Sequence, residues 1–248
     1  MPFKKLLRDP FKKMLFELGA GYYARKLATG PEADIRRDFV RSLDLPPAAA
    51  APKPLRFLDV GCGPGHVARG LARSGYHVIG VDRSRSFLRI AKKLSANDHN
   101  LSFQFSPTEK LPFADGSFDY TYATGVIYWV EHIVATLREM VRVTRPSGTV
   151  AFLDPHASMS IANARAYGLQ NRMSRRDIHK LVTWATSAQL NRRFEESDLR
   201  RLLTEAGLVS LTLEQRLGGM VWFGKGTVPA PQRSSLGNVS LDEEIFRE

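Results

Sequence analysis

Cysteine and long apolar runs are scarce in this sequence of 248 residues. The single cysteine, Cys62, excludes an internal disulfide and fits a reducing compartment. No apolar run approaches the ~18 residues of a membrane-spanning helix, and the basic amino terminus lacks the apolar core and cleavage site of a secretory signal. The histidines are scattered without the spacing of metal ligands, so we expect no metal site. Together these absences predict a cytoplasmic globular protein.

Negative charge is also scarce, because 36 lysines and arginines face 25 acidic residues and give a formal net charge of +11. This excess favours an anionic partner, which could be nucleic acid, a membrane surface or an acidic substrate. The basic, amphipathic amino-terminal segment could make peripheral membrane contact, but we favour a lid that packs on the core. Arginines also cluster at Arg172, Arg175, Arg176, Arg192 and Arg193. Without interleaved aromatic residues, this cluster favours a solvated surface over an RNA-binding one.

The pattern of the chain predicts one main domain with extensions. Residues 1–45 predict a helical lid, residues 46–54 ("PPAAAAPKP") a linker, and residues 227–248 a poorly ordered tail. Between them, over residues 55–226, short apolar strands alternate with helices, which is typical of right-handed crossovers and a parallel sheet. A basic helical insertion follows the fifth strand, over residues 155–194. We therefore predict an α/β, Rossmann-like fold with a seven-stranded, mostly parallel sheet, helices on both faces and an antiparallel last strand.

Particular residues set the expected ends of the elements. The predicted strands span residues 55–60, 77–82, 101–106, 118–124, 148–154, 209–217 and 219–226. Asp9 and Pro10 can restart the amino-terminal helix, as its cap and its first-turn proline, and Gly19 can end it. Ser197 is the expected cap of the last helix, which Gly207 stops.

Three glycines, Gly61, Gly63 and Gly65, follow the first predicted strand. Such a turn lets a ligand approach the backbone closely, and the first strand–helix turn of a parallel sheet is where nucleotides bind. Asp82, at the end of the next strand, can accept hydrogen bonds from both hydroxyls of a ribose. Asp59, just before the turn, would repel a pyrophosphate but attract an ammonium group. A ligand with both a ribose and an amino-acid ammonium is S-adenosylmethionine.

Four segments resemble, in order, the motifs of class I S-adenosylmethionine-dependent methyltransferases: "LDVGCGPG", "VIGVDRS", "EKLPFADGSFDYTYATG" and "LREMVRVTRPSGTVAFLD". The resemblance covers about residues 50–225 and is greatest to the ubiquinone and menaquinone biosynthesis methyltransferases. It implies cofactor contacts at Asp59, Gly61, Cys62, Gly63, Gly65, Asp82, Arg83, Thr108, Glu109, Ala123 and Thr124. Members of this family often close the site with an amino-terminal segment, in which Tyr23 would contact the cofactor and Gly19 and Gly21 would supply a hinge.

The candidate catalytic residues follow the fourth and fifth predicted strands. His132 and His156 could each act as a general base for a phenolic or enolic oxygen, or could pack without a catalytic role. Tyr128 and Trp129 form either a stacking wall for an aromatic acceptor or part of the core. For Cys62 we expect a small loop residue, because no second thiol or Pro-Cys motif supports a thiol nucleophile.

These features predict methyl transfer from S-adenosylmethionine to a small, lipophilic or aromatic acceptor by in-line displacement, with S-adenosylhomocysteine as the product. An RNA or protein methyltransferase that uses the basic surface is an alternative, and a cofactor-binding module without turnover is another. The run "ATGVIYW" lacks the Asp/Asn-Pro-Pro-aromatic sequence that grips a flipped base, which argues against nucleobase amino methylation. No oligomeric state follows from the sequence.

Overall fold

A computed structural model describes the backbone of residues 10–231 and the side chains of residues 19–231. Its centre is a seven-stranded sheet in the order β3-β2-β1-β4-β5-β7-β6, in which β7 runs antiparallel to both of its neighbours and the other pairs are parallel. The strands are β1 Arg56–Val60, β2 His77–Asp82, β3 Leu101–Phe105, β4 Phe118–Thr124, β5 Thr144–Pro155, β6 Val209–Arg216 and β7 Val221–Thr227. The predicted α/β sheet, mostly parallel with an antiparallel last strand, is confirmed.

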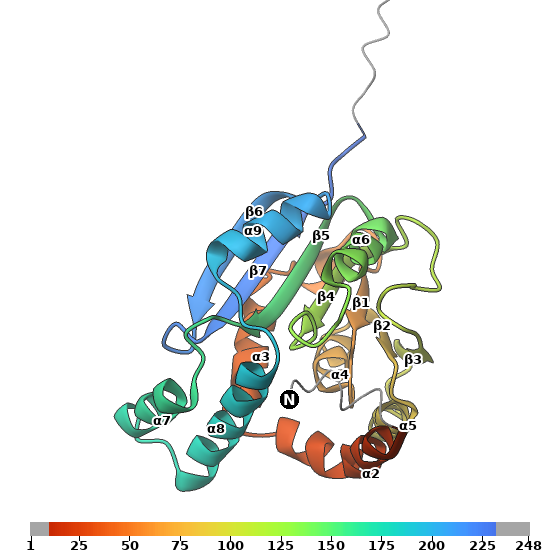
Figure 1. The fold of residues 1–248 in the computed structure, drawn as a ribbon. Helices are drawn as coiled ribbons and strands as arrows, with labels where there is room; N and C mark the ends of the chain where they lie inside the picture. Colours follow the sequence, from red (N-terminus) through yellow and green to blue (C-terminus); the bar gives the residue numbers. More distant parts are fainter. Residues whose placement is uncertain (1–9, 232–248) are drawn as a thin grey trace, which may run out of the picture.

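Helices cover both faces of this sheet (Figure 1). They are α2 Pro10–Leu27, α3 Pro31–Ser42, the short 3₁₀ helix η1 Ala48–Ala50, α4 His66–Arg73, α5 Arg85–Leu94, α6 Ile133–Val143, α7 Ile161–Gln170, α8 Arg175–Leu190 and α9 Glu196–Glu205. Successive strand residues point to opposite faces. Phe57 therefore joins the buried cluster that includes residues of α3 and α4, and Leu58 joins the cluster that includes residues of α6 and α9. Among the described helices, none is long and apolar enough to cross a membrane.

Helix α2 runs through the two glycines that we expected to end it or to form its hinge. The helix includes Gly19 and Gly21 and ends at Leu27, so the predicted end at Gly19 is wrong. A helical glycine costs only about 1 kcal/mol relative to alanine, and the burial of Ala20, Ala24 and Leu27 on one side of the helix offsets that loss. The predicted start at Asp9 lies outside the described residues.

Two other predicted boundaries shift. Helix α9 is capped by Glu195 rather than Ser197, because the chain becomes helical as soon as it leaves the short bridge between His156 and Phe194. Its expected end is present, since Gly207 follows it with a φ of 96°. Strand β7 includes Thr227, one residue into the expected tail, and residues 232–248 of that tail lie outside the described residues.

Candidate functional site

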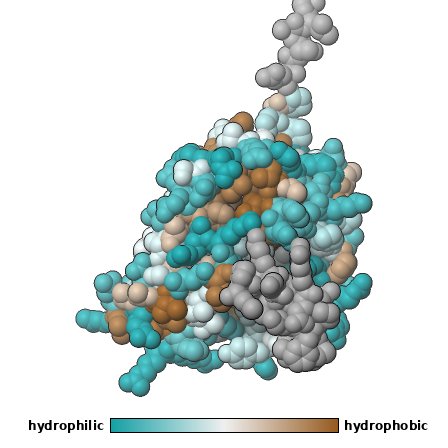
Figure 2. Space-filling view, in the orientation of Figure 1, coloured by the Kyte–Doolittle hydropathy of each residue, from teal (hydrophilic) through white to brown (hydrophobic). Residues whose placement is uncertain are grey.

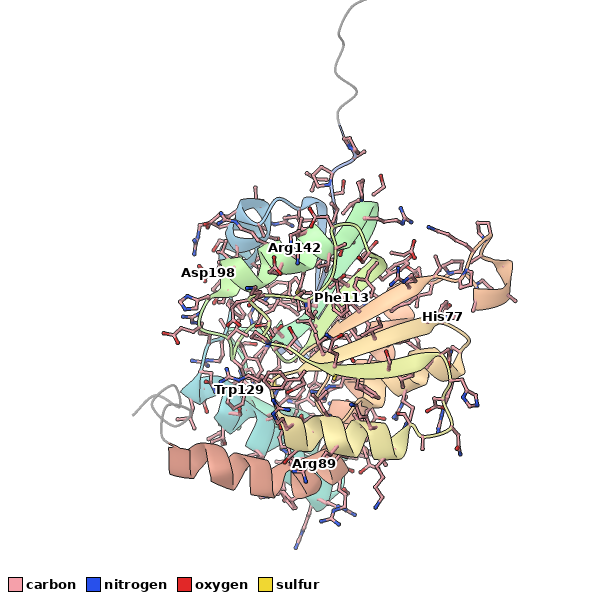
Figure 3. The ribbon with its side chains drawn as sticks, turned by 90° about the vertical axis from the view of Figure 1, so that its right-hand side faces the viewer. His77, Arg89, Phe113, Trp129, Arg142 and Asp198 are labelled. Atoms are coloured by element: carbon pink, nitrogen blue, oxygen red, sulfur yellow. The ribbon has the colours of Figure 1, made fainter. Side chains whose placement is uncertain are left out.

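A cavity of about 410 Å³ lies at the carboxyl ends of β1, β2 and β4. Figure 1 shows α2 and α8 beyond these strand ends, on the side toward which the β4 arrow points. The glycine turn and the segments that follow the strands contribute Gly61, Cys62, Gly63, Pro64, Asp82, Arg83, Ser84, Thr108, Thr124 and Gly125 to the lining. Helices α2, α3 and α8 contribute Tyr23, Lys26, Leu27, Glu32, Arg36, Thr183, Trp184 and Ser187. The remaining lining residues are His66, Val67, Phe87, Val126, Trp129 and Val130. Figure 3 shows Trp129 at the same edge of the sheet, above α2 and α5.

The glycine turn after β1 has three positive φ angles, at Gly61 (70°), Gly63 (52°) and Gly65 (76°). A Cβ on Gly61 would stand 2.5 Å from the Val126 side chain, whereas a Cβ on Gly63 would meet nothing within 4 Å. Gly63 therefore faces open space in the cavity, where a ligand can approach its backbone. Gly65 does not line the cavity; a Cβ there would stand 2.6 Å from the ring of Phe103.

Asp82 lies at the end of β2 with both carboxylate oxygens held by the backbone. Its Oδ2 accepts a hydrogen bond from the Gly63 N–H at 2.8 Å, and its Oδ1 accepts one from the Ser84 N–H at 2.7 Å. The side chain is 8% exposed and lines the cavity. Because a carboxylate oxygen can accept more than one hydrogen bond, this fixed group can receive further donors from a ligand.

Asp59 lies beneath the glycine turn and is 1% exposed. The pKa of its carboxyl is raised to about 7, mainly by burial; the nearby Tyr122 side chain lowers it and the charge of Asp82 raises it. Its Oδ1 has no hydrogen-bond partner among the described residues. The ionised form of such a buried acid is stabilised by a nearby cation or hydrogen-bond donor.

Charged residues of α2 and α3 form a second polar group in the cavity. Glu32 is 1% exposed, and its carboxylate lies 3.1 Å from Lys26 Nζ and 3.6 Å from Arg36 Nη1. The Arg36 guanidinium also lies 5.9 Å from the centre of the Trp184 ring. None of these four residues was predicted from the sequence. The pair Glu32–Arg36, four residues apart in a charged helix, gives the pattern of an exposed ion pair, and nothing local indicates that it is buried.

Three contacts, two polar and one between aromatic rings, tie the cover of the cavity to the rest of the protein. His66 Nε2 lies 2.9 Å from the Ala24 carbonyl oxygen, which joins α4 to α2. Lys180 of α8 donates hydrogen bonds at 2.9 Å to both the carbonyl oxygen and the hydroxyl of Thr29, in the turn between α2 and α3. Tyr23 packs 5.8 Å, centre to centre, from the ring of Phe87. The amino-terminal helices and α8 therefore form one connected cover.

The predicted cofactor residues divide into those that line the cavity and those that do not. Tyr23, Gly61, Cys62, Gly63, Asp82, Arg83, Thr108 and Thr124 line it, whereas Asp59, Gly65, Glu109 and Ala123 do not. Ala123 is fully buried within β4. Burial raises the pKa of the Cys62 thiol, and the carboxylates of Asp59 and Asp82 raise it further, which disfavours a thiolate nucleophile.

The candidate catalytic residues do not line this cavity. His132 is exposed at the start of α6 and faces a different cavity. The His156 ring is held by the Ser158 N–H at 2.8 Å and by Gln215 Nε2 at 3.1 Å. Tyr128 is buried, and its hydroxyl lies 3.5 Å from that of Ser187, which does line the cavity. Burial raises the pKa of Tyr128, which disfavours its ionised form.

Residues 58–152 match the family described as Methyltransferase domain. The chain is 29% identical to malonyl-[acyl-carrier protein] O-methyltransferase of Pectobacterium atrosepticum over 76% of its own length and 72% of that protein. It is 28% identical to demethylmenaquinone methyltransferase of Clavibacter sepedonicus, over 73% of its own length and 76% of that protein. This chain is an S-adenosylmethionine-dependent methyltransferase.

The methyltransferase also shares its fold with solved structures of this class. Phosphoethanolamine N-methyltransferase 2 of Haemonchus contortus, in complex with S-adenosyl-L-methionine, superposes with a TM-score of 0.66 at 14% identity, over 92% of this chain and 60% of that one. The cofactor of the methyltransferase is S-adenosylmethionine.

Proposed function

We propose that the cavity of about 410 Å³ holds S-adenosylmethionine beside a small, lipophilic or aromatic acceptor. The observation that carries this proposal is Asp82, whose carboxylate is fixed by the Gly63 and Ser84 N–H groups at the edge of an open glycine turn. A carboxylate oxygen has more than one acceptor position, so this group could accept hydrogen bonds from the two hydroxyls of a ribose. Arg83 and Thr108, which follow β2 and β3 in the same lining, would flank the adenine.

The charged groups of the cavity fit the amino-acid end of the cofactor. Asp59, with its unpartnered oxygen, would attract the ammonium through the glycine turn or a bridging water. Arg36 and Lys26 give the cavity cationic groups that complement a carboxylate, and Glu32 lies between them. A ligand that carries one ammonium and one carboxylate would satisfy both sets of residues.

The rest of the lining supports an apolar acceptor. Val126, Trp129 and Val130 follow β4, and Trp184 faces the same space from α8. Two hydroxyl groups, those of Thr183 and Ser187, interrupt this apolar wall. A site with aromatic walls and a few hydroxyls suits a lipophilic or aromatic molecule that has one or two polar substituents.

When bound, the cofactor supplies a methyl group on a positively charged sulfur. The residues of this chain contribute position and the exclusion of water, which are worth several kcal/mol of the barrier, up to about 7–11 kcal/mol. Residues of α2, α3 and α8 form part of the wall of the cavity and would displace water from a bound ligand. No histidine except His66 lines the cavity, and His66 holds a backbone carbonyl of α2, so the proposal assigns no general base to a histidine.

The test is the release of S-adenosylhomocysteine with a panel of phenolic, quinone, fatty-acyl and amine acceptors. We expect turnover with at least one lipophilic acceptor, and we expect Trp184→Ala to raise its KM more than it lowers cofactor affinity. Binding of the cofactor without turnover on any acceptor would indicate a binding module, and turnover with RNA or protein alone would contradict the proposed acceptor class.

A further inference from the structure

A second cavity, of about 780 Å³, lies between the first turn of α6, residues 198–202 of α9 and the segment that joins α8 to α9. Part of its lining is apolar, with Ile133 on α6, Leu202 on α9 and Phe194 between the helices. Figure 2 shows apolar residues between the positions that α9 and α6 occupy in Figure 1, bordered by hydrophilic ones. The proposed methyl transfer does not use this cavity.

Cationic groups surround the apolar lining. Arg192, Arg193 and Arg201 line the cavity together with His132, and Asp198 is the one acidic residue in the lining. Among the described residues, neither Arg192 nor Arg193 forms an ion pair, and Arg201 lies 3.8 Å from Asp198 and 3.9 Å from Glu205. Arginines without a carboxylate partner around a concave surface are typical of sites for anions.

The positions of the arginines are fixed by the backbone. Arg193 Nη1 donates hydrogen bonds at 3.0 Å to the carbonyl oxygens of Ala157 and Met159. Helix α6, of 11 residues, begins at the cavity, and its cap residue His132 makes no side-chain capping bond. The first N–H groups of a helix carry partial positive charge and can bind an anion. They add to the guanidinium groups, which form the main part of the site.

The second cavity shares a wall with the acceptor end of the first. Arg192 Nη1 lies 3.4 Å from the carbonyl oxygen of Val130, and Val130 lines the first cavity. On α8, Ser187 lines the first cavity and Gln189 the second. Figure 3 shows Trp129 and Asp198 on the same side of the molecule. The two cavities therefore adjoin at Val130 without sharing a lining residue, and an acceptor that reaches both would pass over this residue.

We propose that this cavity binds the phosphate group of an extended acceptor that also carries an apolar chain, an inference that rests on the proposed function. The guanidinium groups, together with the start of α6, offer more donors than the two oxygens of a carboxylate can use, whereas a phosphate presents three or more acceptor oxygens. The apolar lining from α6 and α9 accounts for the chain. The phosphate would bind among Arg192, Arg193 and Arg201, with the apolar part directed toward Val130.

The test is calorimetric titration of the full chain with hexyl phosphate, in parallel with hexanol and inorganic phosphate. We expect hexyl phosphate to bind more tightly than either fragment. In the double variant Arg192→Gln, Arg201→Gln its dissociation constant should rise at least about tenfold, which is about 1.4 kcal/mol. Arg200→Gln is the matched control, because Arg200 lies on the same helix, pairs with Glu196 at 2.7 Å and does not line the cavity. Thermal unfolding shows whether each variant is folded.

Equal affinity of the double variant and Arg200→Gln for hexyl phosphate would overturn the proposal. Binding of hexanol as tightly as hexyl phosphate would show that the phosphate is not recognised, and equal binding of inorganic phosphate would exclude a site for an extended acceptor. A separate titration with S-adenosylhomocysteine reports on the other cavity. If S-adenosylhomocysteine does not bind to the unaltered chain, the proposed function is contradicted. The hexyl phosphate titration would still show whether the second cavity binds an anion.

Discussion

At the scale of single residues, the cofactor assignment depends most on Asp82. Asp82→Ala removes a carboxylate that is held by two backbone N–H groups and faces the cavity. We expect the dissociation constant of S-adenosylhomocysteine, measured by calorimetry, to rise at least about tenfold, because a bidentate charge-assisted contact is lost. Asp98→Ala, which removes a carboxylate that pairs with Arg73 away from the cavity, is the control and should bind normally. Unchanged affinity of Asp82→Ala would remove the basis of the ribose assignment.

Asp59 predicts a pH dependence of cofactor binding. Because burial raises the pKa of its carboxyl to about 7, the free protein holds a proton there below neutral pH. An ammonium near Asp59 favours the ionised form, so affinity for S-adenosylhomocysteine should rise about tenfold from about pH 6 to about pH 8, with release of a proton on binding. Calorimetry in buffers of different ionisation enthalpy measures that proton. Asp59→Asn should abolish the dependence, whereas Asp154→Asn, whose carboxylate is bound by the Tyr128 N–H, should retain it.

The raised pKa of Asp59 also predicts that the free protein becomes less stable as the pH rises. The unfolded carboxyl ionises at about 3.9, whereas the folded one stays protonated until about pH 7. Its contribution to stability is therefore fully present below the unfolded pKa and is lost as the pH rises toward 7. Asp59→Asn should reduce the decline in the free energy of unfolding over this range, as denaturant titrations at several pH values would show.

At the scale of elements, substitution by alanine should change the free energy of unfolding in opposite directions at two glycines, one in a strand and one in a helix. A Cβ on Gly224 of β7 would stand 2.1 Å from the ring of Phe152, so Gly224→Ala should lower the free energy of unfolding by about 1–3 kcal/mol or more. On the exposed side of α4, Gly70 meets nothing within 4 Å, and Gly70→Ala should raise the free energy of unfolding by about 0.5–1 kcal/mol. Chemical denaturation of both variants tests the pair, and a stabilising Gly224→Ala would contradict the packing described here.

The hydrogen bonds between Lys180 and Thr29 in the cover of the cavity can be tested by substitution. Lys180→Met removes the two hydrogen bonds that join α8 to Thr29. Hydrogen bonds to charged groups contribute about 1.5–3 kcal/mol, so we expect faster amide hydrogen exchange in residues 19–30 and severalfold weaker binding of S-adenosylhomocysteine. Lys93→Met, on the exposed side of α5, is the matched control. Unaltered exchange in Lys180→Met would show that the contact does not hold the cover in place.

The strands could be predicted because each has a local sequence pattern. The helices that cover the cavity could not, because their contribution depends on contacts between distant segments. Each strand is a short apolar run bounded by turn residues, and the glycine turn with Asp82 follows from two adjacent strand–helix units. Glu32, Arg36 and Trp184 reach the cavity from α3 and α8, which are far apart in the sequence. Only the packing of those helices over the strand ends brings their side chains together. Likewise, α2 continues through Gly19 because of the buried residues beyond it, which local propensity does not reveal.

At the scale of the whole molecule, the question is whether the net charge of +11 serves a nucleic-acid partner. Many of the basic residues already have acidic partners, such as Arg145 with Asp119 at 2.7 Å and Arg142 with Glu139 at 2.7 Å. Among the described residues, Arg192 and Arg193 form no ion pair and line the second cavity, and the exposed Arg172, Arg175 and Arg176 form none either. These two groups lie at opposite ends of α8, whereas a polyanion would need a continuous basic surface.

That distribution predicts how RNA and salt should act on the enzyme. A labelled single-stranded RNA should bind only weakly at low salt and lose its affinity steeply as salt is raised, because its contacts are nonspecific. Because the proposed acceptor is a small molecule bound in the first cavity, saturating RNA should not inhibit the release of S-adenosylhomocysteine with a small acceptor. Fluorescence anisotropy and the release assay measure the two effects on one sample. Competition that survives physiological salt would mean that RNA reaches the reactive methyl group and that the substrate is a nucleic acid.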